Sequence, residues 1–246
     1  MIAIVMVTYR KVEYARMVIG NVCACMTPDM KLFVVDNHSG PEMLDLLNKV
    51  ADRAEDRVEI TGCGKNIGKA NAVNSMVGMH SLLDRYDRLV FIDQDIIFRP
   101  SDLTALVECL ADMENPGMIA MDYYPWNSPK PKQGGTVSVQ GRSGKHYEMA
   151  VHGNRGRTTA FVAGGVFGLT AETVRTCLNG RIYPETPYVY FNEDAVLDIE
   201  LNRQGRLNGY LGGTAALHLP ELDPKYFAWK NRMRGEKVPP TAGYYD

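Results

Sequence analysis

The first half of the chain alternates short apolar runs with stretches in which apolar residues recur at helical spacing. The apolar runs, rich in β-branched residues, predict buried strands at residues 1–8, 31–36, 58–60 and 89–92. The helical spacing predicts helices over residues 13–26, 41–50 and 71–83, and a further helix that Ser101 caps. Strands that alternate with helices predict an α/β fold with a mostly parallel central sheet, in which ligands bind beyond the carboxyl ends of the strands.

The pattern changes after residue 121. Residues 123–157 are rich in Gly, Pro, Ser, Lys and Arg, which favours a long surface excursion with a hairpin at 136–151. Periodic segments then return and predict an apolar strand region at 161–168, a short helix from Ala171, a helix over 192–204, and strands at 207–211 and 215–219. There is no internal repeat and no linker-like stretch, so we expect one domain.

The composition indicates where in the cell the protein is found, but it does not indicate what the protein binds. The 246 residues carry 27 basic and 29 acidic side chains, and this near-neutral balance indicates no class of partner. The five cysteines form no CxxC pair, so we expect reduced thiols and a cytoplasmic protein. The apolar start is short and lacks a basic leader, and no stretch approaches the roughly 18 apolar residues that span a bilayer. We expect a soluble protein or one that is peripheral at a membrane surface.

Charged side chains stand where predicted strands end. Asp36 follows the second strand, Asp93 and Asp95 follow the fourth, and His218 closes a late strand. Alternate residues of an extended strand point the same way, so Asp93 and Asp95 would repel each other unless a cation lay between them. Mg²⁺ and Mn²⁺ suit such oxygen ligands, and His218 would add an imidazole ligand. The alternative is a polar turn beside a packed histidine.

Six short motifs give these residues a context. In chain order they are Val7-Thr8-Tyr9-Arg10, residues 34–39, residues 66–74, residues 91–95, residues 163–167, and Phe191-Asn192-Glu193-Asp194 ahead of a helix that ends in Arg203-Gln204-Gly205. In order and spacing the set resembles the family 2 glycosyltransferases with the GT-A fold, over roughly residues 1–218. The resemblance implies a nucleotide-diphospho-sugar transferase fold. Its nucleotide-binding half would be 1–122, its acceptor-side half, with a small antiparallel part, 123–219, and its basic lid or tail 220–246.

The resemblance also implies roles at the donor. Around the nucleotide it implies Thr8, Tyr9, Arg10, Asp36, Asn66, Lys69, Asn71, Asn74 and Asp93. A carboxylate accepts a base N–H, a tyrosine ring stacks on the base, and a lysine at a helix N-terminus suits phosphate. The asparagines could instead cap a helix and form turns. Beside the donor sugar it implies Gly164 and Gly165, where missing side chains admit either a ligand or a tight strand crossing.

For the chemistry, the resemblance implies a metal at Asp93, Asp95 and His218. Asp95 would be the direct ligand, and Asp93 would meet the ribose or a metal-bound water. The catalytic pair would be Glu193 and Asp194, with Asp194 as the general base. A helix N-terminus stabilises an ionised carboxylate and weakens it as a base, so the metal-held diphosphate leaving group would carry more of the barrier. The other interpretation of the pair is simple complementation of the helix dipole.

Two segments are strongly basic. Residues 130–157 carry six Lys and Arg side chains against Glu148, and residues 225–237 carry five against Glu236. The first would contact an anionic acceptor; the alternative is a solvated surface. The second resembles the segment after the histidine in rhamnosyltransferase-like members, a lid in which Trp229 and Lys230 would meet the donor sugar or the acceptor. Position 230 has lysine where those members have arginine. Arginine binds phosphate through two parallel hydrogen bonds, a geometry that lysine does not offer.

We therefore expect a metal-dependent, inverting glycosyltransferase that uses Mn²⁺ or Mg²⁺. The donor would be a nucleotide-sugar, with a UDP-sugar favoured, and the acceptor hydroxyl would lie on a glycan, a lipid-linked glycan or another anionic acceptor, nucleic acid included. A sugar-nucleotide nucleotidyltransferase shares this layout but carries a Gly-rich phosphate loop after the first strand, where this chain has Thr8-Tyr9-Arg10-Lys11. A non-catalytic nucleotide-sugar-binding protein is the third hypothesis. Such a protein would not need to keep Asp93, Asp95, Asp194 and His218.

Overall fold

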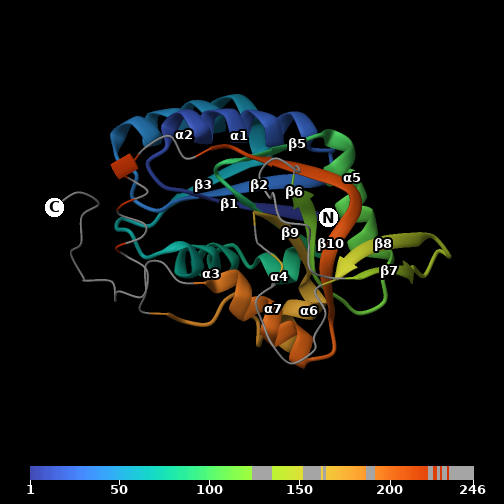
Figure 1. Cartoon of the computed structure of the whole chain (residues 1–246). Helices are drawn as coiled ribbons and strands as arrows, with labels where there is room; N and C mark the ends of the chain where they lie inside the picture. Colours follow the sequence, from blue (N-terminus) through green and yellow to red (C-terminus); the bar gives the residue numbers. More distant parts are fainter. Residues whose placement is uncertain are drawn as a thin grey trace.

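The computed structural model describes residues 1–123, 135–151, 162, 165–186 and 192–220, together with residues 224, 225, 228 and 232. In these residues ten strands form one sheet, with helices on both of its faces (Figure 1). The strand order is β3-β2-β1-β4-β9-β6-β10-β8-β7, and β5 pairs with β10 outside this path. This arrangement confirms the predicted α/β fold.

The first half of the chain folds as its pattern predicts. Its elements are β1 (Ile2–Thr8), α1 (Val12–Cys25), β2 (Met30–Asp36), α2 (Pro41–Ala54), a 3-10 turn at Glu55–Arg57, β3 (Val58–Gly62), α3 (Lys69–Met79), α4 (Leu82–Arg85) and β4 (Arg88–Asp93). Strands β3, β2, β1 and β4 are parallel neighbours, so their carboxyl ends lie along one edge of the sheet. In the β1–β2 register, Thr8 stands opposite Asp36.

The second half adds antiparallel pairs. Its elements are β5 (Ile96–Phe98), α5 (Pro100–Asp112), β6 (Pro116–Tyr123), β7 (Gly135–Gln140), β8 (His146–Val151), β9 (Val166–Thr170), α6 (Ala171–Cys177), α7 (Glu193–Arg203) and β10 (Leu207–His218). Strand β9 runs antiparallel to both β4 and β6, while β10 runs parallel to β6. The predicted hairpin is β7 with β8, and it joins the edge of the sheet at β10.

Three local predictions were wrong, and one strand was not predicted. Ser101 does not cap α5: the helix begins at Pro100, and the Asp102 carboxylate accepts the Arg99 backbone N–H at 3.1 Å. The helix expected over 71–83 starts at Lys69 and ends at Met79, and α4 follows separately. The two late strands are one strand, β10, whose pairing with β6 shifts register between Leu211 and Ala216. The three-residue strand β5 was not expected.

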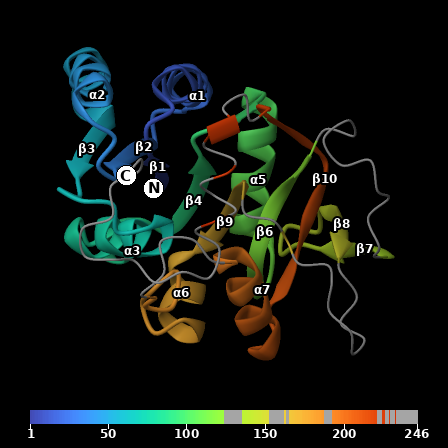
Figure 2. The same ribbon diagram turned by 60° about the vertical axis from the view of Figure 1, so that its left-hand side comes forward.

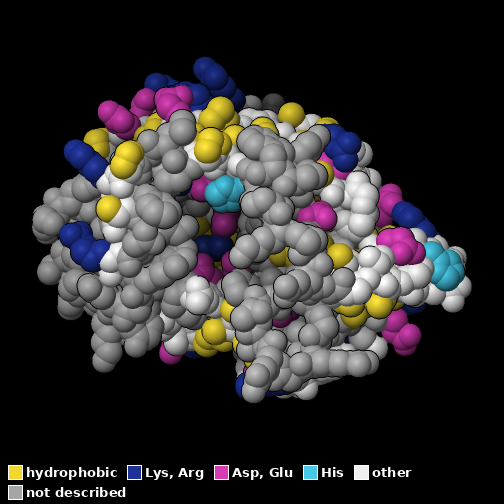
Figure 3. Space-filling model, in the orientation of Figure 1, with side chains coloured by type: hydrophobic (Ala, Val, Ile, Leu, Met, Phe, Trp, Pro, Cys, Tyr) yellow, Lys and Arg dark blue, Asp and Glu magenta, His cyan; other side chains and the backbone are white. Residues whose placement is uncertain are grey.

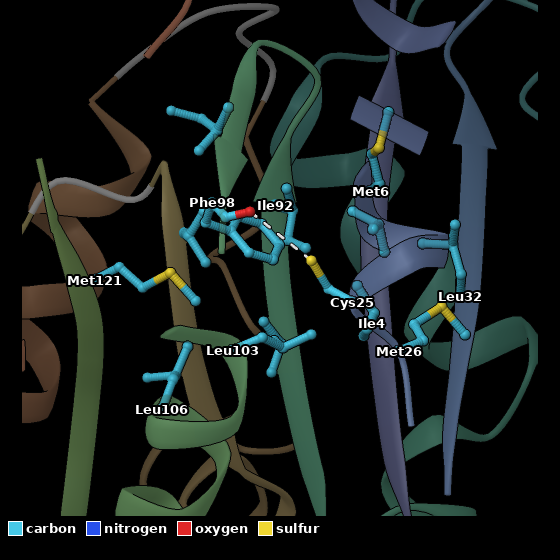
Figure 4. Close-up of a cluster of buried hydrophobic side chains, with 14 of the residues drawn as sticks. Ile4, Met6, Cys25, Met26, Leu32, Ile92, Phe98, Leu103, Leu106 and Met121 are labelled. Carbon is cyan, nitrogen blue, oxygen red and sulfur yellow. Dashed lines mark hydrogen bonds between the residues drawn. The ribbon is translucent and has the colours of Figure 1, made fainter. Parts of the chain in front are cut away.

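Two apolar layers hold the helices against the sheet. Helices α1, α2 and α5 cover one face, and α3, α6 and α7 cover the other (Figures 1 and 2). Strand β1 shows the cause: Ile4 and Met6 face the first layer, while the alternate residue Val5 faces the second. Figure 4 shows the first layer, in which Cys25 Sγ lies 3.8 Å from the Phe98 carbonyl oxygen. Burying one such apolar side chain stabilises the fold by about 1.5–3 kcal/mol.

All five cysteines are free thiols, as the sequence predicted, and Cys25 and Cys109 are buried. Among the described residues, no helix combines the length and the apolar character needed to cross a bilayer.

Candidate functional site

Thr8 and Asp36 meet at the carboxyl ends of β1 and β2. Both are buried, at 0% and 2% exposure, and Thr8 Oγ1 donates to Asp36 Oδ1 at 3.1 Å. The Ser39 backbone N–H donates to Asp36 Oδ2 at 3.1 Å, and the Ser39 hydroxyl donates to Asp36 Oδ1. A carboxylate buried this deeply at a strand end is costly without donors, and these three donors fix the Asp36 side chain in place.

The next residues along the first loop are Tyr9 and Arg10. Arg10 has a φ of 60°, its backbone N–H donates to Ser39 Oγ at 2.9 Å, and its guanidinium carbon lies 5.8 Å from the centre of the Tyr9 ring. The predicted group Thr8, Tyr9, Arg10 and Asp36 is therefore brought together at one place.

Gln94 was not predicted to have a role, yet it fixes this loop. Its Oε1 accepts the Tyr9 backbone N–H at 2.7 Å, and its Nε2 donates to the Tyr9 carbonyl oxygen at 2.9 Å. The side chain is only 8% exposed. The middle residue of Asp93-Gln94-Asp95 thus ties the turn of the motif to the backbone of Tyr9.

A second group of hydrogen bonds fixes the chain just before α3. Asn37 Nδ2 donates to Asn66 Oδ1 at 2.7 Å, and Asn37 Oδ1 accepts the Ile67 N–H at 2.9 Å. Gly68 then turns the chain with a φ of 81°, a conformation that favours glycine. The turn sets Lys69 at the first residue of α3, close to the end of β4. The sequence did not point to Asn37 because its hydrogen-bond partners lie 29 and 30 residues further along the chain.

Asn71 and Asn74 bind protein backbone in this structure. Asn71 Nδ2 donates to the carbonyl oxygens of Ile67 and Thr186, both at 2.9 Å. Asn74 Nδ2 donates to the Tyr183 carbonyl oxygen at 2.7 Å, and its Oδ1 accepts the N–H groups of Ile182 and Tyr183. The two asparagines therefore tie α3 to the segment between α6 and α7.

The two aspartates of the motif do not stand together on an extended strand. Asp93 ends β4, and residues 94 and 95 form a turn before β5, so the premise of alternation along a strand was wrong. Asp93 Oδ1 lies 2.7 Å from Lys69 Nζ, and Asp95 Oδ2 lies 3.1 Å from Lys11 Nζ. The Asp93 N–H donates to the carbonyl oxygen of Gly165 at 2.8 Å, which brings this predicted glycine beside the motif.

His218 and Asp95 are neighbours, as predicted. His218 Nε2 lies 3.7 Å from Asp95 Oδ1, because His218 pairs with Ile96 across β10 and β5 and the Leu219 N–H donates to the Asp95 carbonyl oxygen at 2.7 Å. Within the described ranges no three His, Cys, Asp or Glu side chains make up a metal-holding group. A metal here would need ligands from a bound molecule as well as from Asp95 and His218.

The acidic pair opens α7 and meets the same lysine. Lys69 Nζ lies 3.7 Å from Glu193 Oε1 and 3.8 Å from Asp194 Oδ1. Burial alone would lower the pKa of Lys69, but Asp194 and Asp93 hold that pKa well above its usual value. Figure 3 shows a histidine with acidic and basic side chains gathered near the middle of this face of the molecule.

Burial is the largest influence on the pKa values of Glu193 and Asp93. It raises the pKa of Glu193 to about 7, against the opposing charge of Lys69. It also raises the pKa of Asp93, where the Lys69 charge again acts in the opposite direction. Acids with displaced pKa values that share one lysine are typical of functional sites.

Three predicted site residues, Gly164, Trp229 and Lys230, lie outside the described residues. Of the first basic segment, Arg142 and Lys145 are described, and both are bound to α5. Arg142 donates to backbone carbonyl oxygens at the end of that helix, and Lys145 Nζ lies 3.0 Å from Glu108 Oε2.

Comparisons with known structures show the fold. A mannosyltransferase from Pyrobaculum calidifontis, in complex with GDP-Man and Mn²⁺, has a TM-score of 0.66 at 14% identity, over 94% of this chain and 60% of its own. TarS 1-349 from S. aureus has a TM-score of 0.61 at 14% identity, over 89% and 60%. GalNAc-T7 with UDP, GalNAc and Mn²⁺ has a TM-score of 0.64 at 13% identity, over 90% and 44%. This chain thus spans about 60% or less of the length of these three proteins.

No curated protein matches the chain. The model of "Glycosyl transferase family 2", in contrast, matches residues 3–164, which is more than half of its length. The matched region contains the Asp36 cluster, the Asn66-Gly68-Lys69 turn and the Asp93-Gln94-Asp95 motif. The neighbouring structures share the GT-A architecture found here. The chain belongs to glycosyltransferase family 2 and has the GT-A fold.

Proposed function

We propose that this protein is a metal-dependent, inverting glycosyltransferase that moves a sugar from a UDP-sugar to an acceptor hydroxyl. One observation carries the proposal: Asp93 of the motif and the acidic pair of α7 converge on Lys69, whose Nζ lies 2.7 to 3.8 Å from the carboxylates of Asp93, Glu193 and Asp194. The Asp36 cluster lies at the neighbouring strand ends. Together they supply a base site, a phosphate site and an acid–base group in sequence along one edge of the sheet.

The hydrogen bonds of Asp36 favour uracil, whose single ring N–H thymine shares, over guanine. Asp36 Oδ1 already accepts two hydroxyl groups, from Thr8 and Ser39, while Oδ2 accepts one backbone N–H. A carboxylate oxygen accepts about two bonds, so Oδ2 can take one more donor. Uracil offers a single ring N–H, whereas guanine offers two adjacent N–H groups that need both oxygens. The Tyr9 ring would stack on the base.

The diphosphate would lie at Lys69 and the metal. Lys69 opens α3, where helix N–H groups and an ammonium favour phosphate. The described donor set fits a divalent ion held by Asp95, His218 and phosphate oxygens, with Asp93 reaching it through water or binding the ribose. The carboxylates of Asp93, Asp95, Glu193 and Asp194 lie beside Lys11 and Lys69, an acidic setting that suits a divalent cation. When bound, the ion would stabilise charge on the leaving group. Two of the similar structures hold Mn²⁺.

Asp194 is the general base in this proposal. Its side chain is 21% exposed, against 8% for Glu193, so it is the member of the pair that an acceptor can reach. The acceptor oxygen bonds to the sugar carbon, its proton passes to Asp194, and the bond from that carbon to the diphosphate breaks with its electron pair on the phosphate oxygen. Attack opposite the leaving group inverts the configuration of the carbon.

The acceptor would be a glycan, a lipid-linked glycan or another anionic molecule, nucleic acid included. The basic segments at 130–157 and 225–237 support an anionic acceptor by their charge alone. The attachment of Arg142 and Lys145 to α5 removes two of the six basic side chains of the first segment from this argument.

The test is transfer from a panel of nucleotide-sugars, with Mn²⁺, with Mg²⁺ and with a chelator. We expect donor hydrolysis or transfer from a UDP-sugar that the chelator abolishes. Release of pyrophosphate from a nucleoside triphosphate would establish a nucleotidyltransferase instead. Binding of UDP-sugars with neither transfer nor hydrolysis would establish a non-catalytic binding protein.

A further inference from the structure

Tyr183 is among the largest fully buried side chains of the protein, at 1% exposure, and it lies in the segment between α6 and α7. Its hydroxyl donates to Asp194 Oδ1 at 3.3 Å. Asp194 Oδ1 is also the oxygen that faces Lys69 Nζ at 3.8 Å. A buried phenol that donates a hydrogen bond to the Asp194 carboxylate can fix the orientation of that carboxylate.

Asn74 holds the backbone of this tyrosine from α3. Its Oδ1 accepts the Tyr183 N–H at 3.2 Å and the Ile182 N–H at 3.0 Å, and its Nδ2 donates to the Tyr183 carbonyl oxygen at 2.7 Å. Both backbone groups of Tyr183 are thus satisfied by one amide. Asn71 binds the Thr186 carbonyl oxygen in the same segment, so α3 grips it twice.

The hydroxyl stays a donor at working pH. Burial, with the negative charges of Asp194 and Glu193, raises the pKa of Tyr183 well above its usual value, although Lys69 opposes this. The phenol therefore keeps its proton and can donate a hydrogen bond to the carboxylate that it faces.

We propose that Tyr183 and Asn74 are positioning residues for Asp194: Asn74 fixes the Tyr183 backbone, and the Tyr183 hydroxyl fixes one Asp194 oxygen so that the carboxylate meets the acceptor hydroxyl in a single orientation. The inference rests on the proposed function. It assigns neither residue a contact with substrate.

The test is Tyr183→Phe, which removes the hydroxyl and keeps the ring in its buried position. The matched control is Tyr86→Phe. Tyr86 is 5% exposed, its ring lies edge-on to Phe33 with the ring centres 5.6 Å apart, and it belongs to neither the candidate site nor a basic segment. Loss of a bond to a charged group should lower kcat of Tyr183→Phe about tenfold or more and leave KM for the donor unchanged. Tyr86→Phe should keep the wild-type kcat and KM.

Asn74→Ala is the second variant, and it serves where Tyr183→Phe does not fold. It should show the same loss of kcat with the same unchanged KM for the donor, and the double variant should be little worse in kcat than the worse single variant. Wild-type kcat in a folded Tyr183→Phe or Asn74→Ala protein would overturn the inference while sugar transfer stands. Absence of transfer by the wild-type protein would overturn the proposed function itself.

Discussion

The ammonium of Lys11 lies 3.1 Å from Asp95 Oδ2, and the two side chains are only 12% and 16% exposed. Asp95 is the carboxylate that would ligate the metal, and its other oxygen faces His218 at 3.7 Å. An ammonium and a divalent ion that share one carboxylate repel each other, and partial burial weakens the screening by water. In the proposed site, Lys11 and the metal would therefore compete for Asp95.

Lys11→Met should tighten the binding of Mn²⁺, measured by calorimetry with saturating UDP present. Removing one positive charge this close to the site should raise the affinity about tenfold or more at low salt. The matched control is Lys49→Met, since Lys49 forms an exposed pair with Asp45 on α2 and should leave the affinity unchanged. Equal or weaker Mn²⁺ binding in Lys11→Met would show that the lysine supports the metal and does not oppose it.

Asp194→Asn should lower kcat by a factor of about 10² to 10⁴, the usual contribution of a general base. The affinity for UDP with Mn²⁺ should stay near the wild-type value, because the base acts on the acceptor. Glu200→Gln is the control on the same helix, where Glu200 pairs with Arg203 at the surface. A fully active Asp194→Asn protein would remove Asp194 as the base and leave the fold and the family as they are.

Gln94→Ala should weaken donor binding by loosening the first loop. The change deletes two hydrogen bonds, of 2.7 and 2.9 Å, that hold the Tyr9 backbone at a position 8% exposed. Leaving such groups without partners should cost about 1–3 kcal/mol in the free energy of unfolding and raise KM for the donor. Gln204→Ala is the control, because the amide of Gln204 bonds only at the surface, to Glu200. If both variants keep the wild-type KM, the loop does not depend on Gln94.

The parts of the fold that repeat a local period could be predicted from the sequence. Strand β1 and helix α2 each carry enough apolar residues in register to be recognised alone. Two strands were expected at 207–211 and 215–219, but one strand runs on through Gly212 and Gly213 with an irregularity in which Gly213 has a φ of 78°. Strand β5 has three residues, too few for a period to show.

The candidate site also contains residues that the sequence predicts and residues that it does not. Asp93, Asp95 and Glu193 could be found because strand ends and helix starts mark them. Lys11 and Tyr183 could not, because each acquires its role from contacts that form only on folding. Lys11 meets Asp95 across 84 residues, and Tyr183 lies in a segment without helical or strand period. Only the fold shows that Asn74 holds that segment.

The raised pKa of Glu193 gives the stability of the protein a pH dependence that one substitution should remove. In the folded chain the pKa is about 7, mainly because of burial, against an ordinary value of 4.5. Between these values the folded chain holds a proton that the unfolded chain has released. The contribution is therefore complete below pH 4.5 and is lost as the pH rises through 7. The difference amounts to about 3 kcal/mol at most.

Urea unfolding at pH 5 and at pH 8 measures this difference. The wild-type protein should lose more stability than Glu193→Gln between the two values, because glutamine has no proton to release. Glu13→Gln is the control, since Glu13 is exposed on α1 and pairs with Arg16 at the surface. Its pH dependence should match that of the wild type. If Glu193→Gln also matches the wild type, Glu193 is ionised in the folded protein at both pH values, and Lys69 outweighs the burial.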